Sequence, residues 1–214
     1  MQERGQQRYQ VRFGWGVPGA ARVAADAHLL VWVDVLPAAA FPDDVRADDV
    51  RHDDVRHHDV HRGVPLGQLP DGPEVVLGHL GNTAAVAGRV ARLQAERGDR
   101  CVVAVVAAGH VDGPVGGDAA AEAGEAPDVR TVPEFAVEDL LGAGAVVDAL
   151  VESGIDHTSP EAAAACAAWT GLRRAAKHLV TASEAAAVLG AERVHAALAV
   201  GPDLVTLRPS TARA

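Results

Sequence analysis

Three nearly continuous apolar runs stand out along the chain, over residues 28–36 (HLLVWVDVL), 74–78 (EVVLG) and 101–108 (CVVAVVAA). They are rich in valine, and polar residues do not alternate regularly within them. This pattern is typical of strands that are covered on both faces, as in a parallel sheet. A shorter segment, residues 9–13, predicts one further strand before them.

Helical spacing of apolar positions separates and follows these runs. It predicts helices over residues 17–27, 83–97, 135–153, 160–180 and 183–200. Asn82 stands at an N-cap position, Gly98 follows a helix end, and Pro160 takes the first helical position after Ser159. The alternation of strands and helices predicts an α/β fold, with a mostly parallel sheet flanked by helices in one compact domain over residues 1–214.

Two polar segments interrupt the pattern and predict long disordered loops, at 37–73 and 111–132. The first contains DDVRADDVRHDDVRHHDVHR (43–62), which repeats a five-residue phrase. A period of five gathers no apolar stripe on a helix or a strand, so the repeat predicts a solvated insertion. A second interpretation stays open, in which its aspartates and histidines bind zinc, nickel or copper. These histidines are His52, His57, His58 and His61.

Composition limits the partners that we expect. A chain of 214 residues with 49% hydrophobic residues can bury a sizeable core. Its net charge of −10 and its pI near 5.4 argue against a nucleic-acid or anionic-membrane surface, which needs clustered Lys and Arg. The first residues, MQERGQQRYQ, are not followed by the apolar segment of a signal peptide. We therefore expect a cytoplasmic protein.

Polar residues follow the predicted central strands, where ligands of open α/β sheets bind. They are Asp34 at the end of the first, His79 and Asn82 after the second, and His110 after the third. Glu138 and Asp139 lie near the start of a predicted helix. Acidic residues there also offset the helix dipole without any catalytic role, and Asn82 could serve only as a cap. If Asp34, Glu138 and Asp139 converge, magnesium is the natural cation.

A glycine motif offers an alternative function. Residues 14–19, GWGVPG, match the dinucleotide-binding fingerprint, and Asp34 lies where a ribose-binding carboxylate would stand. The short preceding strand and Pro18, which lacks a backbone N–H, favour a tight turn before a helix.

The order of motifs resembles a known family. VWVDVL, LGNTAAVA, VAVVAAG, AVEDLLGAGAVVDAL and SPEAAAA occur in the order seen in ComB-type 2-phosphosulfolactate phosphatases, over residues 9–36 and 75–208. The chain looks like a shortened, divergent member. The resemblance implies a magnesium-dependent phosphatase that hydrolyses a small anionic phosphomonoester, in the namesake case 2-phosphosulfolactate. It leaves a homodimer open.

The resemblance also implies roles for single residues. Asp34, Glu138 and Asp139 match the family's metal-binding carboxylates, with Asp34 also catalytic. Asn82 matches an asparagine that opens the next helix, and we expect it to contact the substrate. His110 stands where the family more often has glutamate, and in the mechanism that we expect it is the acid or base.

The chain departs from the family pattern at several anion-binding positions. Pro37 and the alanines after it replace a hydroxyl-rich run, and Glu134 and Phe135 replace an Arg-Pro pair. A second hypothesis is therefore a degenerate member that binds a metabolite or partner without catalysis.

Overall fold

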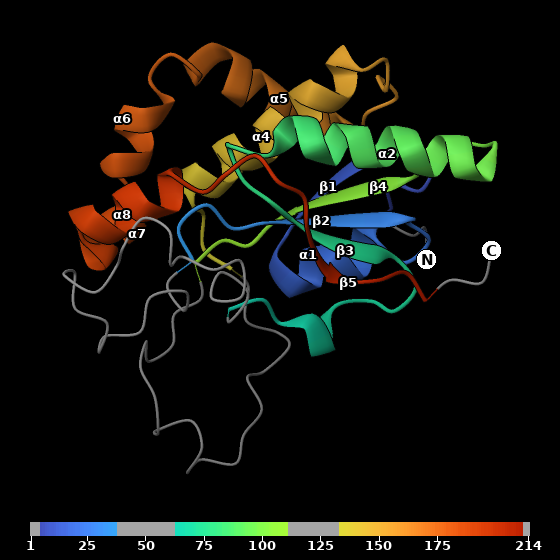
Figure 1. The fold of residues 1–214 in the computed structure, drawn as a ribbon, viewed down its shortest axis with the longest axis horizontal. Helices are drawn as coiled ribbons and strands as arrows, with labels where there is room; N and C mark the ends of the chain where they lie inside the picture. The colour runs from blue at the N-terminus through green and yellow to red at the C-terminus, as the bar shows by residue number, and fades with distance from the viewer. Residues whose placement is uncertain (1–4, 38–62, 111–132, 212–214) are drawn as a thin grey trace, which may run out of the picture.

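The computed structural model describes residues 5–37, 63–110 and 133–211. Their centre is a five-stranded sheet in the order β1-β4-β2-β3-β5 (Figure 1). Four strands are parallel, and β5 is antiparallel to β3. The strands are β1 (Val11–Trp15), β2 (Leu29–Val33), β3 (Glu74–Gly78), β4 (Val103–Ala107) and β5 (Val205–Arg208). The predicted α/β fold with a mostly parallel sheet is confirmed.

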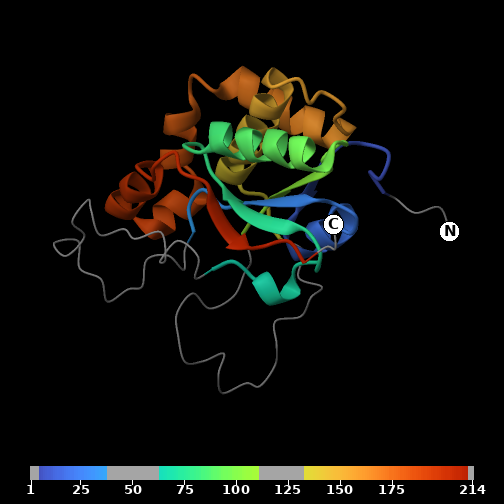
Figure 2. The same cartoon turned by 45° about the vertical axis from the view of Figure 1, so that its right-hand side comes forward.

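Helices cover both faces of this sheet (Figures 1 and 2). One face carries α1 (Gly16–Val23) and the short 3₁₀ helix η3 (Leu66–Gln68). The other carries α2 (Thr83–Arg97) and α4 (Val137–Glu152), with α5 packed on α4. The remaining helices are α5 (Pro160–Leu172), α6 (Ala176–Thr181), α7 (Glu184–Leu189) and α8 (Ala191–Leu198).

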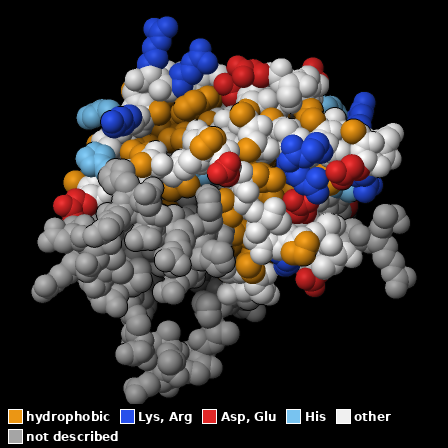
Figure 3. Space-filling view, viewed as in Figure 1, with side chains coloured by type: hydrophobic (Ala, Val, Ile, Leu, Met, Phe, Trp, Pro, Cys, Tyr) orange, Lys and Arg blue, Asp and Glu red, His pale blue; other side chains and the backbone are white. Residues whose placement is uncertain are grey.

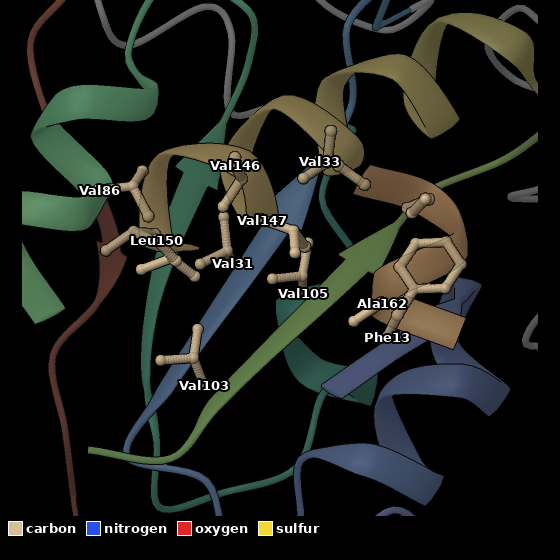
Figure 4. Packing of buried hydrophobic residues seen from close by; sticks show 14 of the residues in the cluster. Phe13, Val31, Val33, Val86, Val103, Val105, Val146, Val147, Leu150 and Ala162 are labelled. Carbon is tan, nitrogen blue, oxygen red and sulfur yellow. The ribbon is translucent and has the colours of Figure 1, made fainter. Parts of the chain in front are cut away.

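The core lies mainly between the sheet and α4. Valines of β2 and β4 meet Val146, Val147 and Leu150 of α4, and Val86 of α2 closes one side (Figure 4). All four of these helical residues are fully buried. The apolar runs seen in the sequence thus form strands that are covered on both faces, and they hold the carboxyl ends of the strands in fixed positions.

Several predicted boundaries agree with the structure. β3 and α2 have the predicted bounds, Gly98 ends α2 with a φ of 66°, and the Ser159 hydroxyl accepts a hydrogen bond from Ala162 N at 3.1 Å. The predicted helix over 160–180 is divided into α5 and α6. The one over 183–200 is divided at Gly190, whose φ of 86° no helix accommodates.

The segment before β3 is packed against the sheet. Residues 63–73 belong to the first predicted loop, yet Leu69 is buried in the cluster beneath β2 and β3. Arg208 of β5 donates hydrogen bonds to the carbonyls of Leu66 and Leu69, at 3.1 and 3.3 Å. The repeat at 43–62 and the predicted loop at 111–132 lie outside the described residues, so their predicted disorder and metal binding stay predictions.

One face of the described part of the chain carries charges of both signs (Figure 3). On the face seen in Figure 3, acidic and basic side chains are interspersed with hydrophobic ones. None of the helices within the described ranges is long and apolar enough to cross a membrane.

Candidate functional site

Four predicted site residues meet at the carboxyl edge of the sheet. β2 and β4 are parallel neighbours, and Val33 at the end of β2 is paired with Ala107 at the end of β4. Asp34 directly follows β2, and His110 follows β4. α4 begins at the same edge and contributes Glu138 and Asp139 from its first turn. We call Asp34, His110, Glu138 and Asp139 the edge cluster.

Asp139 ties the two strand ends together. Its Oδ1 accepts a hydrogen bond from Val35 N at 2.8 Å, and its Oδ2 accepts one from Gly109 N at 2.9 Å. The side chain is buried. Burial and the neighbouring charge of Asp34 hold the pKa of Asp139 well above its usual range, although the two N–H donors lower it. Each carboxylate oxygen therefore already has one backbone donor.

Glu138 is the most deeply buried acid of the cluster, with 1% of its surface exposed. Its Oε1 lies 3.3 Å from His110 Nε2. Its Oε2 has no hydrogen-bond partner in the part of the chain that the structure describes. Because burying an unpartnered carboxylate oxygen is costly, this atom is a candidate for binding a cation or a water molecule.

Asp34 completes the group of carboxylates. The residue is partly exposed, yet its carboxyl group is surrounded by protein. This burial, together with the charge of Glu138, raises the pKa of Asp34 to about 7. Asp34 and Glu138 are therefore close enough to repel each other when both are ionised.

Gly109 is a site residue that sequence analysis missed. Its φ is 70°, and a Cβ at this position would lie 2.6 Å from the Glu134 carbonyl oxygen and 2.9 Å from Pro133 Cβ. Only glycine fits there. Beside it, His110 and Glu134 exchange two backbone hydrogen bonds, at 3.1 and 2.7 Å. A glycine directly after a strand-like run was the available signal, since such a position favours a left-handed turn.

Asn82 lies outside the edge cluster, after β3. It is completely buried at the N-cap position of α2, but its side chain does not cap the helix. Its Oδ1 accepts a hydrogen bond from His79 N at 2.9 Å, and its Nδ2 donates to the Leu77 carbonyl at 3.0 Å. These contacts give Asn82 a structural role in this turn, and its contact with substrate stays a prediction.

His79 is buried in the same turn. Its Nδ1 accepts a hydrogen bond from Gly81 N at 3.2 Å, while its Nε2 has no partner among the described residues. Burial lowers the pKa of His79 to about 4, so the ring is neutral at physiological pH.

The strand order argues against the dinucleotide interpretation of GWGVPG. In that fold the first two strands are neighbours, so the acidic residue after the second reaches the ribose. Here β4 lies between β1 and β2. The glycines have packing roles instead, because Cβ atoms at Gly14 and Gly19 would meet each other's backbones at 3.0 and 2.8 Å, and Pro133 fills the space beside Gly16.

The donor set of the edge cluster fits magnesium only partly. Within residues 5–37, 63–110 and 133–211, no three His, Cys, Asp or Glu side chains are arranged to hold a metal ion as they stand. Magnesium, however, is commonly bound through one or two carboxylates while it keeps several waters. Asp34 and the unpartnered Oε2 of Glu138 meet that smaller requirement. Asp139, predicted as the third ligand, is held by Val35 and Gly109.

Comparison of the chain with models of known protein families and with curated proteins finds no match. The likeness to ComB-type phosphatases therefore remains a resemblance of motifs.

Proposed function

We propose that the edge cluster is the site of a magnesium-dependent phosphatase acting on a small phosphomonoester, by resemblance 2-phosphosulfolactate. The observation that carries the proposal is the buried, unpartnered Oε2 of Glu138 beside the high-pKa carboxyl of Asp34. Two carboxylates that repel each other in a buried site are stabilised by a divalent cation. The cytoplasmic location and the homodimer expected from the sequence belong to this proposal as predictions.

In this proposal Asp34 and Glu138 hold the cation. Magnesium, when bound, polarises the phosphoryl oxygens and lowers the pKa of a bound water. Glu138 Oε1 orients His110 through Nε2, which leaves Nδ1 of the ring to exchange a proton with water or the leaving group. Asp139 fixes the separation of the two strand ends that carry Asp34 and His110.

A second function is supported by the charges around the cluster. No Arg or Lys among the described residues contributes to the pKa of Asp34 or of Asp139. Phosphoryl transfer sites normally supply cationic donors to the phosphoryl oxygens, and loss of one such donor costs about 10²-fold in rate. This observation favours a member of the fold that binds a cation or a metabolite without catalysis.

Phosphate release by the purified protein tests the proposal. We expect turnover of small phosphomonoesters, including 2-phosphosulfolactate, that requires Mg²⁺ and falls at least about 10²-fold in both Asp34→Asn and Glu138→Gln. Binding of Mg²⁺ itself, followed by calorimetry, should weaken in the same two variants.

Glu161→Gln is the matched control. Glu161 is the second residue of α5, as Glu138 is of α4, but its side chain is exposed. The control should keep wild-type turnover and metal affinity. Mg²⁺ binding without phosphate release would favour the non-catalytic function, and Mg²⁺ affinity unchanged in Asp34→Asn would contradict both.

A further inference from the structure

Two aromatic rings lie side by side near the carboxyl edge of the sheet. Trp15 ends β1 and is half-buried, and Phe135 lies just before α4. Their ring centroids are 5.6 Å apart at an interplanar angle of 48°. Trp15 also meets Phe13 of the core edge-to-face, with the ring centroids 5.6 Å apart. The core therefore holds Trp15 in place, and Trp15 in turn supports Phe135.

Phe135 is unusually exposed for its size. It leaves 63% of its surface in water, whereas Phe13 leaves 6%. An exposed phenylalanine that rests on a second aromatic ring presents a rigid apolar surface at little conformational cost.

The two rings border the edge cluster. A Cβ at Gly109 would lie 3.4 Å from Cε3 of Trp15, and Gly109 N donates to Asp139. Phe135 follows Glu134, whose backbone is paired with that of His110, and it lies within one helical turn of Glu138. Trp15 and Phe135 therefore lie beside the turn that carries His110 and is held by Asp139.

The charges around the edge cluster and the exposed aromatic rings both favour a ligand whose second group is aromatic and not anionic. A substrate with a second anionic group needs a second cation, and no Lys or Arg of the described residues affects the pKa of Asp34 or Asp139. A substrate with an aromatic ring needs only a surface on which to stack, and Phe135 with Trp15 provides one.

We propose that Phe135 and Trp15 form an aromatic subsite of the edge cluster, which selects phosphomonoesters whose alcohol part carries an aromatic ring. This inference rests on the proposed phosphatase function. It narrows the substrate class from small phosphomonoesters in general to those with an aromatic ring, in place of the sulfonated substrate that the resemblance implies.

Binding of two phosphonates tests the subsite without requiring turnover. Phenylphosphonate and methylphosphonate carry the same anionic group, and only the first carries a ring. In calorimetry with saturating Mg²⁺, we expect the wild-type protein to bind phenylphosphonate about tenfold more tightly than methylphosphonate, as one good aromatic contact allows. We expect Phe135→Ala to reduce this ratio to about two or less, because the stacking surface is lost.

Two further variants separate stacking from general damage. Phe135→Tyr keeps the ring and should keep the ratio. Val151→Ala removes another exposed apolar side chain from the opposite end of α4 and should also keep it.

Equal affinities for the two phosphonates in the wild-type protein, or a ratio retained in Phe135→Ala, would overturn the subsite while the phosphatase proposal stands. If neither phosphonate binds and no phosphoester is hydrolysed, both proposals fail. A wild-type dimer that Phe135→Ala converts to monomer in sedimentation, with the ratio unchanged, would assign the ring to a contact between two copies instead.

Discussion

The two edges of the sheet bury charged groups in different ways. At the amino edge Arg12, 1% exposed, donates to the carbonyls of Gln7, Tyr9 and Val23 and forms an ion pair with Asp26. Glu74 at the start of β3 accepts three hydrogen bonds from Arg89, the shortest 2.7 Å long.

At the carboxyl edge the buried charges have the same sign. Burial and the neighbouring carboxylates raise the pKa of Asp34 and of Asp139, and Glu138 Oε2 has no partner among the described residues. No Arg or Lys of the described residues contributes to either shift. The amino edge is thus arranged for stability. The carboxyl edge keeps an electrostatic penalty that a bound ligand would relieve, which is typical of a functional site.

The largest effect on folding stability is expected from removing Arg12 at the amino edge. Arg12→Met removes the guanidinium donors to the three carbonyls and to Asp26, so the free energy of unfolding should fall by about 3–5 kcal/mol. Urea unfolding measures this change in the free energy of unfolding. Arg22→Met, at an exposed position in the last turn of α1, should change stability by less than about 0.5 kcal/mol. A loss below about 1 kcal/mol for Arg12→Met would mean that water replaces the guanidinium and that the two edges differ less than we argue.

A smaller loss of folding stability should follow from replacing Gly109 at the carboxyl edge. Gly109→Ala combines a left-handed backbone with a contact of 2.6 Å to the Glu134 carbonyl, so we expect a loss of about 2–4 kcal/mol. Gly98→Ala has a similar φ of 66° but open space around the new Cβ, and it should cost only about 1–2 kcal/mol. Thermal and urea unfolding measure the loss of stability in both variants. The difference between the two losses gives the cost of the steric contact at Gly109. Equal losses would mean that the Gly109 turn adapts.

The smallest effect is expected from removing the charge of Asp34, and this change should stabilise the fold. Since the pKa of Asp34 is raised to about 7, the folded state holds its proton more tightly than the unfolded state. Stability from this group is complete below pH 4 and is lost as pH rises through 7. Asp34→Asn should therefore be more stable than wild type above pH 7. The full shift would correspond to about 4 kcal/mol, but because Asp34 is partly exposed, solvent screening reduces the expected difference to the order of 1–2 kcal/mol, and this difference vanishes toward pH 4.

The comparison must be made between variants rather than on the wild type alone. Since the pKa of His79 is lowered to about 4, this residue adds a slope of opposite sign, with stability lost as pH falls from about 6.5 to 4. Subtracting the wild-type curve from that of Asp34→Asn cancels the His79 contribution. A difference that does not depend on pH would contradict the raised pKa of Asp34.

The sequence predicts the fold where one pattern decides the structure. Valine-rich runs locate the central strands, and α2 lies between a polar turn and Gly98 as expected. The prediction fails where local signals are weak or compete. Alanine favours helix so strongly that the break at Gly190 is hidden. β5 is missed because it is a four-residue strand that depends on pairing with β3.

The candidate site is predictable only where its residues follow directly from the order of the strands. The carboxyl ends of neighbouring parallel strands must meet, so the proximity of Asp34 and His110 follows from strand order. The partners of polar atoms do not follow from a pattern. That Asp139 binds two backbone N–H groups, and that Asn82 is fully engaged in its own turn, depends on positions that only tertiary packing sets.

The place of β4 between β1 and β2 has a consequence for folding order. A ribosome makes residues 11–33 early, yet β1 and β2 make no ladder with each other, because each is paired with residues 103–107. Until that segment emerges, both strands expose unpaired backbone groups that could join the wrong neighbour. Pairing across such sequence separations slows folding. A nascent chain arrested before residue 103 should therefore be the form of this protein most in need of a chaperone.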